Sequence, residues 1–401
     1  MNPVSAGSNH VLIKSVIRKA GLDDIYQKIM DYQRLTFEDG VKLFESRDLS
    51  SVGYMANIVR ERMHGNRSFF VRNRQLNPTN VCDYSCMFCS FYRREGEEGG
   101  YTMTMEQIAE RVRDGIKHGI QEIHITSGLH PGLPFSYYTD MLQTIKEVAP
   151  YLHIKGFTAV EIEYYAHHYG MSLREVLEKL MAAGLEAMPG GGAEIFADRV
   201  RKKICDEKST AEGWIAVHEI AHELGLMTNA TMLYGHIETY EERVDHLVRL
   251  RDLQDRSRSK GTKGQFSTFI PLKYQHENNR LKNLPEVSAF EDLKMIAVPR
   301  LMLDNFPNIK AYWVVIGKRM AQMALSYGGN EIEGTILEET IMSMAGTDSA
   351  HGMTEPELIK LIKDAGRQPI ERDALYHVIK TYDESDIEQA LSPKPQIPIL
   401  N

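Results

Sequence analysis

Three of the four cysteines in this 401-residue chain lie close together, at Cys82, Cys86 and Cys89. The spacing Cys-x3-Cys-x2-Cys places three thiolates on one tight loop, where each can bind one corner of a cubane iron–sulfur cluster. With three protein ligands, one iron stays open to a small chelating molecule. The motif therefore predicts a [4Fe–4S] cluster. Structural zinc, which usually has two Cys-x2-Cys knuckles or added histidines, and buried cysteines placed by chance are the alternatives.

Composition and charge restrict the class of protein. A net charge of −8 argues against nucleic-acid binding through overall basicity. No apolar run reaches the roughly 18 residues that a membrane span needs, and the N-terminus lacks the apolar core of a signal peptide. Four cysteines are too few for a disulfide-stapled secreted protein. We therefore expect a cytoplasmic protein with neither a nucleic-acid nor a membrane partner, whose oligomeric state the sequence does not indicate.

Short apolar segments alternate with longer amphipathic segments from about residue 74 onward. The predicted strands are 75–79, 122–126, 153–160, 185–188, 227–234, 266–271, 310–315 and 331–334. The predicted helices between them include 105–118, 135–148, 173–183, 241–254 and 290–306. This alternation implies parallel strands with right-handed crossovers, and about eight such units fit a (β/α)8 barrel of the TIM type.

The barrel predicts a division of the chain and a place for its chemistry. We expect a helical extension over residues 1–63, an α/β barrel over 64–346, and a C-terminal helical extension and tail over 347–401. Active sites of such barrels lie at the C-terminal ends of the strands. The unusual residue clusters follow successive predicted strands: residues 82–89, 128–131, Glu161, 190–194 and 235–238. We therefore expect these clusters to share one mouth of the barrel.

The cluster motif and the segment Thr126-Ser-Gly-Leu-His-Pro131 together resemble the radical S-adenosylmethionine (SAM) superfamily. The resemblance implies that SAM chelates the open iron and is cleaved there. It also implies that Phe88, the aromatic residue before the last cysteine, lies near the adenine, and we add Tyr84 on the same loop. Ser127 and Gly128 would contact the methionine amino group, although relatives usually carry glycine where this chain has Ser127. A plain turn at Gly128 is the alternative.

Five further segments resemble one group within that superfamily. They are residues 77–80 (NPTN), 157–161 (FTAVE), 189–195 (PGGGAEI), 229–238 (NATMLYGHIE) and 311–313 (AYW). The group contains aminofutalosine synthase and dehypoxanthine futalosine cyclase of the menaquinone pathway, with deazaflavin synthase subunits further off. The segments 232–236 and 310–313 are most similar to the synthases, and the cyclase is the nearest competitor.

The resemblance implies a reaction and its partners. The 5′-deoxyadenosyl radical would add to the enol ether of 3-[(1-carboxyvinyl)oxy]benzoate, and rearrangement with loss of the carboxylate carbon would give 6-amino-6-deoxyfutalosine. A reductase, flavodoxin or ferredoxin would supply the electron. The cyclase would instead abstract hydrogen from a nucleoside-derived substrate and release 5′-deoxyadenosine.

Other polar and glycine residues at the predicted strand ends are candidates for binding SAM. Glu161 can bind the ribose hydroxyls, with a solvated loop carboxylate as the alternative. Gly191 lies in a triple glycine that lets the backbone approach a ligand closely, or that forms a flexible turn. Glu194 and Arg199 are candidates for the polar ends of SAM.

Catalytic and substrate-binding candidates lie near the ends of later strands. Tyr234, His236 and Glu238 alternate at a strand end, so at least one should point into the barrel mouth. His236 could donate to a substrate carboxylate or transfer a proton near neutral pH, or be a core histidine with its hydrogen bonds satisfied. The candidate substrate-binding residues are Asn80, His276, Arg300 and Tyr312.

The segment His218-Glu-Ile-Ala-His222 matches H-E-x-x-H, the signature of zinc proteases. The third metzincin histidine would fall at position 228, which is Thr228. The two histidines also lie on an ordinary inward helix stripe with Trp214 and Val217. A zinc hydrolase that uses His218, Glu219 and His222 is therefore a remote alternative function. The fourth cysteine, Cys205, is interpreted as a bystander.

Overall fold

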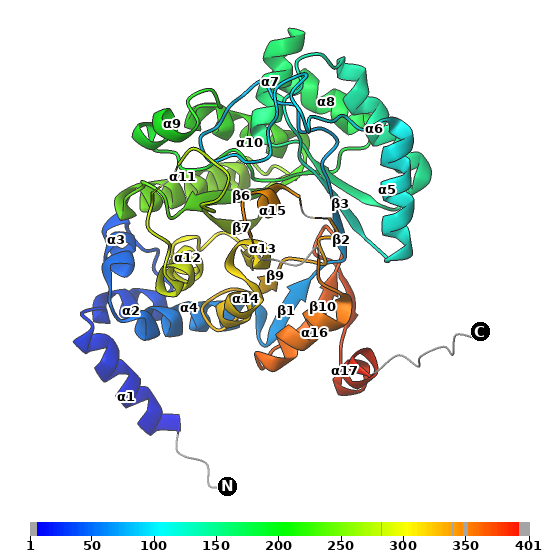
Figure 1. Ribbon diagram of the computed structural model, residues 1–401. Helices are drawn as coiled ribbons and strands as arrows, with labels where there is room; N and C mark the ends of the chain where they lie inside the picture. The colour runs from blue at the N-terminus through cyan, green and yellow to red at the C-terminus, as the bar shows by residue number, and fades with distance from the viewer. Residues whose placement is uncertain (1–5, 282, 339, 348–351, 393–401) are drawn as a thin grey trace.

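The computed structural model describes residues 6–281, 283–338, 340–347 and 352–392 (Figure 1). Its strands are β1 (Arg67–Phe70), β2 (Asn73–Leu76), β3 (Glu122–Ile125), β4 (His153–Gly156), β5 (Ala187–Met188), β6 (Met227–Tyr234), β7 (Phe266–Lys273), β8 (Asn308–Ala311), β9 (Glu331–Ile332), β10 (Gln368–Arg372) and β11 (Val378–Thr381).

The helices before β6 are α1 (Ala6–Lys19), α2 (Asp23–Met30), α3 (Phe37–Glu45), α4 (Leu49–His64), α5 (Met105–Lys117), α6 (Phe135–Val148), α7 (Ala159–Tyr169), α8 (Leu173–Ala183), α9 (Asp198–Ile204) and α10 (Ala211–Leu224). Those after it are α11 (Tyr240–Ser259), α12 (Ala289–Met302), α13 (Trp313–Ile316), α14 (Lys318–Ala324), α15 (Ile341–Met344), α16 (Glu355–Asp364) and α17 (Glu384–Leu391).

The strands form a closed parallel barrel, because residues 67–76 supply both ends of the strand order. The order runs from β2 through β3, β4, β5, β6, β7 and β8 to β9, and then to β1. The β1 part pairs with β9, and the β2 part pairs with β3. A parallel bridge between Arg74 and Leu337 completes the ring. The predicted (β/α)8 barrel is therefore confirmed.

Side-chain caps start several helices of the barrel: α5, α7 and α11 after strand loops, and α8 after α7. Thr104, Thr158, Ser172 and Thr239 each accept a hydrogen bond from the backbone three residues on, where Gln107, Glu161, Glu175 and Glu242 bond back. Such capping boxes satisfy amide groups that a helix start leaves without partners. They hold the residues at the strand ends in fixed positions.

The largest differences in strand ends are at β4 and β8, which each end four residues before the predicted position. Phe157 has a φ of +59° and Thr158 caps α7, so β4 ends at Gly156 and residues 157–160 are not strand. Likewise β8 ends at Ala311, and residues 313–316 form α13. In both places the sequence stays apolar while the chain turns over the barrel mouth. Periodicity therefore could not locate the strand end.

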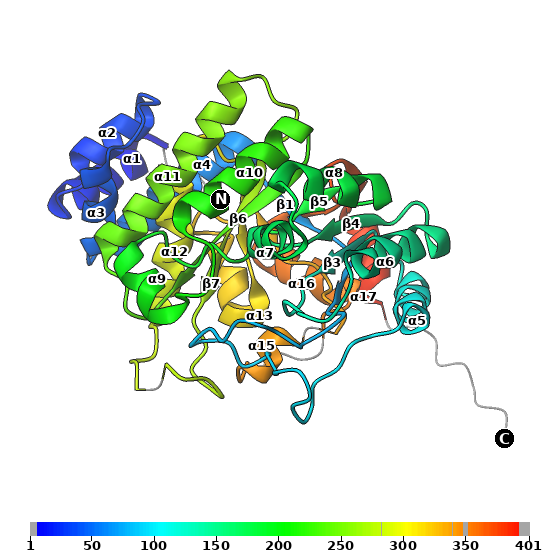
Figure 2. The same ribbon diagram turned by 90° about the horizontal axis from the view of Figure 1, so that it is seen from above.

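The terminal segments pack on the outside and base of the barrel. The N-terminal helices α3 and α4 contact α11 and α12, and both views place them on that side (Figures 1 and 2). At the other end β10 pairs in parallel with β1, and β11 adds an antiparallel edge strand. The strand β10 lies beyond residue 346, the predicted end of the barrel, yet belongs to the same sheet. The predicted domain boundaries themselves stay a prediction. Residues 393–401 of the predicted tail lie outside the described part.

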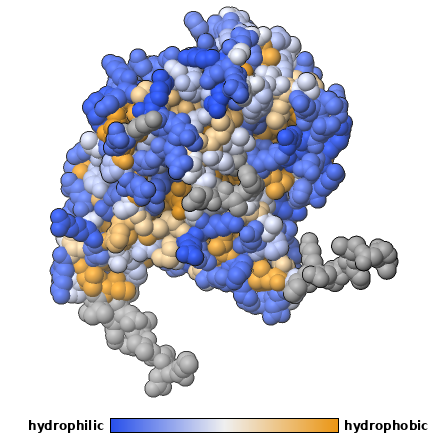
Figure 3. All heavy atoms as spheres, in the orientation of Figure 1, coloured by the Kyte–Doolittle hydropathy of each residue, from blue (hydrophilic) through white to orange (hydrophobic). Residues whose placement is uncertain are grey.

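The surface in the orientation of Figure 1 carries mainly hydrophilic side chains, with smaller apolar areas between them (Figure 3). Within the described part of the chain, every helix is too short or too polar to cross a lipid bilayer.

Candidate active site

A cavity of about 290 Å³ opens at the C-terminal ends of the strands, where the sequence clusters were expected to meet. Its wall is mostly apolar. Polar groups come from the loops after β2, β3, β4 and β5 and from the inward faces of β2, β3, β6 and β7. Of the predicted residues, those that line it are Cys82, Tyr84, Cys86, Phe88, Cys89, Ser127, Gly128, Glu161, Gly191, Glu194 and Tyr312.

The loop after β2 brings its three cysteines to the cavity wall. The Cys82 amide donates to Arg93 O at 2.9 Å, and the Cys89 amide donates to Cys86 O at 3.2 Å. Cys86 is only 7% exposed, and burial raises the pKa of its thiol to about 12. A positively charged metal centre would reverse this preference, because the thiolate is the form that binds metal.

The three cysteines of this loop all line the cavity. In a cubane each cysteine binds a different iron. Three thiols on one loop at one cavity wall are consistent with the ligands of a [4Fe–4S] cluster.

Glu161 connects the loops after β3 and β4. Its Oε1 accepts from the Ser127 hydroxyl at 3.1 Å, and its Oε2 accepts from the Thr158 amide at 2.7 Å and the Thr158 hydroxyl at 2.8 Å. The carboxyl is 2% exposed, and burial raises its pKa to about 7. Because Glu161 also caps α7, its carboxyl is held in place at the cavity wall.

Gly128 lies against the cysteine loop with no space for a side chain. A Cβ at this position would be 2.2 Å from Val81 O and 3.0 Å from the Asn80 carbonyl carbon. The Gly128 amide donates to Thr79 O at 2.8 Å, and the Asp83 amide donates to Leu129 O at 2.8 Å. These contacts fix the cysteine loop against the loop after β3.

Lys208 forms an ion pair inside the cavity that the sequence did not reveal. Its Nζ lies 2.6 Å from Glu194 Oε1 and 4.9 Å from the centre of the Phe88 ring. Burial alone would lower the pKa of Lys208, but the nearby acidic side chains, among them the Glu194 carboxylate, outweigh burial and raise it. Lys208 follows α9 without a distinctive motif, so only the tertiary structure brings it beside the cysteines.

Cys205, interpreted as a bystander, follows a residue that contacts the cysteine loop. Its neighbour Ile204 accepts a hydrogen bond at O from the Met87 amide, at 2.9 Å. Cys205 itself is 3% exposed, and burial raises the pKa of its thiol to about 11.

The expectation that Tyr234, His236 or Glu238 points into the barrel mouth is wrong. The Tyr234 hydroxyl donates to Asp292 at 2.8 Å, and Glu238 pairs with Arg243 at 2.7 Å. The His236 ring is fully buried, with Nε2 3.0 Å from Leu233 O. None of the three lines the cavity. Alternation places Leu233 inward and Tyr234 outward, and Gly235, with a φ of +88°, then turns the chain.

Four other predicted residues lie outside the cavity wall. Arg199 is mostly exposed and pairs with Glu242. Arg300 is buried and donates to Gly328 O at 2.8 Å. Asn80 donates to Gly99 O at 2.9 Å and so braces the cysteine loop.

The fourth, His276, packs edge-on against the Tyr274 ring at 4.8 Å. These positions give the predicted ligand contacts of Arg199, Arg300, Asn80 and His276 no geometric support.

Several polar lining residues were missed because they lie within strands rather than after them. Gln75 on β2, His124 on β3, and Asn229 and Thr231 on β6 face the cavity. Each occupies an inward position of a strand that alternates in side-chain direction. Strand alternation was the signal that could have found them.

The H-E-x-x-H segment is part of the core. His222 uses both ring nitrogens, with Nδ1 2.7 Å from Ser257 Oγ and Nε2 2.8 Å from Thr228 Oγ1. The His218 ring packs on Trp214 at 3.8 Å, and Glu219 pairs with Lys260 on the surface. The zinc-hydrolase alternative is therefore not supported.

Two family models match this chain in sequence. The Radical SAM superfamily matches residues 76–250, and the CofH/MqnC C-terminal region matches residues 262–385. Aminodeoxyfutalosine synthase of Thermus thermophilus is 46% identical over 92% of this chain and 98% of its own length. The Streptomyces coelicolor enzyme of the same name is 42% identical over 94% and 99%.

A cyclic dehypoxanthine futalosine synthase from Halalkalibacterium halodurans is 36% identical, over 91% of this chain and 97% of its own length. Among solved structures, methylornithine synthase superposes with a TM-score of 0.67 at 18% identity, covering 91% of this chain and 99% of that one. The superposition on methylornithine synthase, at this low identity, shows the fold alone. On the sequence matches, the chain belongs to the radical SAM superfamily and, within it, to the aminodeoxyfutalosine synthase family.

Proposed function

We propose that this chain joins the 5′-deoxyadenosyl group of SAM to 3-[(1-carboxyvinyl)oxy]benzoate and yields aminodeoxyfutalosine. The observation that carries the proposal is the convergence of three cysteines, the Ser127–Glu161 pair and the Lys208–Glu194 pair on one cavity. Identity to the Thermus and Streptomyces enzymes over nearly the whole chain selects the reaction. A reductase, flavodoxin or ferredoxin is proposed as the electron donor.

The cysteine loop would hold the cluster. Cys82, Cys86 and Cys89 would each bind one iron and leave the fourth iron for the amino and carboxylate groups of SAM. When bound, the reduced cluster supplies the electron that cleaves SAM and releases the adenosyl radical. The buried position of Cys86 and the apolar cavity wall keep water away from that radical.

The surrounding side chains would bind the rest of SAM. Glu161, fixed by Thr158 and Ser127, would accept hydrogen bonds from the ribose hydroxyls. Phe88 and Tyr84, on the cysteine loop, would contact the adenine. Lys208 would pair with the methionine carboxylate, because it is a cation at the cavity wall beside the cluster loop. Glu194 holds the Lys208 ammonium in position at 2.6 Å.

Replacing Lys208 with glutamine is expected to weaken SAM binding about 10- to 100-fold, the usual worth of a hydrogen bond to a charged group. The iron content should stay unchanged, since the three cysteines are intact. Equilibrium dialysis with labelled SAM would measure the affinity. Lys203→Gln, which removes an exposed lysine of α9, is the matched control. Unchanged SAM affinity in Lys208→Gln would disprove the proposed contact.

The fate of the adenosyl group tests the proposed reaction. With SAM labelled in its adenosyl part and the enolpyruvyl benzoate as co-substrate, we expect the label in aminodeoxyfutalosine. Liquid chromatography with mass detection separates this product from free 5′-deoxyadenosine. Label found only in 5′-deoxyadenosine would sink the proposal. That result would favour the hydrogen-abstracting cyclase reaction, which is the alternative suggested by the 36% identity to the Halalkalibacterium halodurans cyclic dehypoxanthine futalosine synthase.

A further inference from the structure

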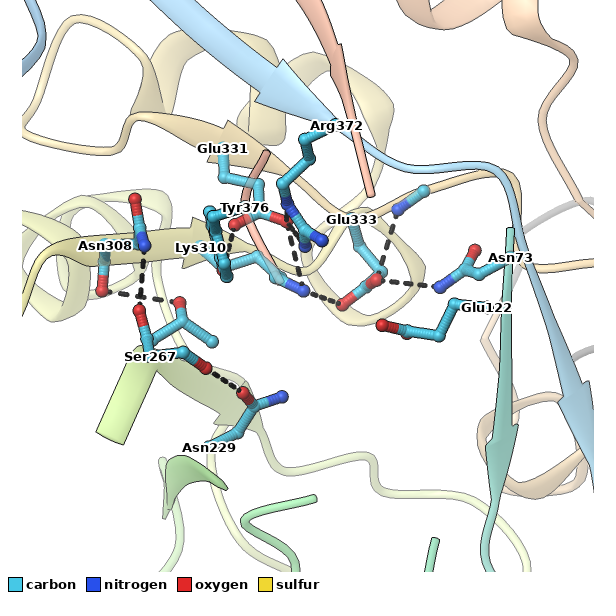
Figure 4. Close-up of polar contacts among 12 residues, drawn as sticks. Asn73, Glu122, Asn229, Ser267, Asn308, Lys310, Glu331, Glu333, Arg372 and Tyr376 are labelled. Carbon is cyan, nitrogen blue, oxygen red and sulfur yellow. Dashed lines mark hydrogen bonds and ion pairs between the residues drawn. The ribbon is translucent and has the colours of Figure 1, made fainter. Parts of the chain in front are cut away.

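The barrel interior beneath the cavity is filled by ion pairs instead of the branched aliphatic layers that usually fill such barrels. Lys155 pairs with Glu122 at 2.6 Å, and Lys310 lies 3.2 Å from Glu331 and 3.0 Å from Glu333. Arg372 reaches Glu331 from β10 (Figure 4). We call these residues the ion layer: Glu122, Lys155, Lys310, Glu331, Glu333 and Arg372. Three carboxylates face three cations, so the layer carries no net charge.

Asn229 presents a free amide group above this layer. The side chain is 3% exposed and lines the cavity. Its Oδ1 accepts from the Ser267 hydroxyl at 2.8 Å, which fixes the orientation of the amide (Figure 4). Its Nδ2 donates to no group of the described residues, and it is not fully shielded from the cavity. The amide is therefore available to a bound acceptor.

His124, on β3, adds a second donor at the cavity wall. Gln75 Nε2 lies 3.3 Å from His124 Nδ1, and His124 Nε2 has no partner among the described residues. Burial, with the nearby Lys155 ammonium, lowers the pKa of His124 to about 4, so the ring is neutral near pH 7. With Nδ1 accepting from Gln75, the proton lies on Nε2.

These donors suit an anionic oxygen group. Glu333, which also lines the cavity, does not compete for them. One of its oxygens accepts from Asn73 at 3.1 Å, and the other pairs with Lys310. The balanced ion layer neither attracts nor repels an anion strongly, so hydrogen-bond donors decide what binds. A carboxylate accepts up to about four hydrogen bonds and donates none.

The substrate geometry places one carboxylate at this depth. The enol ether must face the adenosyl carbon near the cysteine loop, and the ring carboxylate extends away from it at the other end of the molecule. His124 lies three residues before Ser127 in the sequence. In an extended chain this places His124 about 10 Å further from the barrel mouth than Ser127. Resting on the proposed function, we propose that Asn229 and His124 bind the ring carboxylate and select aryl ethers that carry it.

The test compares two ligands with the oxidised, cluster-loaded enzyme in the presence of SAM, where no turnover occurs. The ligands are 3-[(1-carboxyvinyl)oxy]benzoate and 2-phenoxyacrylate, which lacks the ring carboxylate. The wild type should prefer the first about 30-fold, as expected for hydrogen bonds to a charged group. In Asn229→Asp, which faces the ligand with a carboxylate, the preference should reverse. In Asn229→Leu and His124→Phe it should fall by about tenfold or more.

Thr231→Val is the matched control, because Thr231 lines the same wall but its hydroxyl already donates to Gly190 O at 2.6 Å. Retained SAM affinity shows that each variant is folded. A preference that survives in all three variants would overturn the inference. If the wild type binds both ligands equally and still forms aminodeoxyfutalosine, only this inference fails. If it binds neither ligand and forms no product, the proposed function fails.

Discussion

Anaerobically reconstituted Cys86→Ala protein is expected to be colourless and to contain almost no iron, whereas the wild type should be brown and contain about four irons per chain. The expected loss is complete because the motif offers only three thiolates. Removing one leaves two cysteines, which cannot hold the cubane against solvent and chelators. Iron analysis and the visible spectrum measure this outcome, and product formation should fall below detection.

Cys205→Ala is the matched control for that experiment. Its thiol is as buried as that of Cys86, and it lies one residue from the hydrogen bond between Ile204 and the cysteine loop. Full iron content is expected in this variant, because Cys205 lies outside the Cys-x3-Cys-x2-Cys motif. Iron retained in Cys86→Ala, or zinc found in place of iron in the wild type, would overturn the assignment of the cluster ligands.

Replacing Gly128 with alanine is expected to be the most damaging change that leaves every ligand in place. The new methyl group would lie 2.2 Å from Val81 O and 2.8 Å from the Val81 carbonyl carbon. These are backbone atoms, so no side chain can rotate away, and the hydrogen bonds on either side of Gly128 prevent retreat. We expect a loss of about 3 kcal/mol in the free energy of unfolding, together with poor cluster loading.

Denaturant unfolding of the apoprotein and iron analysis after reconstitution measure the two effects separately. Gly132→Ala, in the same segment, is the control. There a Cβ would meet only side-chain atoms of Glu95 and His130, at 3.2 Å and 3.3 Å, which can move. If Gly128→Ala matches Gly132→Ala in stability and iron content, the close approach of the two loops is not essential.

The sequence was sufficient to predict the barrel because short, mostly buried strand segments alternate with longer amphipathic helices, several of which begin at a side-chain cap. The starts of β3, β4 and β6 agree with the predicted positions. Strand ends were harder to predict at 157–160 and 312–315, where the chain stays apolar while it turns above the barrel. Burial alone does not distinguish a strand from such a turn.

The residues of the candidate site likewise fall into those that local sequence could locate and those that only tertiary packing brings together. Residues in loops directly after a strand, such as Ser127, Glu161 and Gly191, could be placed because all parallel strands deliver their ends to one mouth. Lys208 and Cys205 reach the cysteines only through the packing of α9, which leaves no local pattern. The expected inward direction of Tyr234 was wrong because strand alternation, with Leu233 inward, turns its side chain outward. The expected inward direction of His236 was wrong because Gly235, with a positive φ, turns the chain before it.

The ring closure through residues 67–76 has a consequence for how the chain folds during synthesis. This early strand must pair with β9, with the bridge at Leu337 and with β10, all made more than 250 residues later. Until then β1 and the growing sheet both expose unpaired edges, and such long-range pairing is slow. The mouth that surrounds the cysteines is therefore complete only when nearly the whole chain has been made, and we expect a cluster to be inserted only after that point.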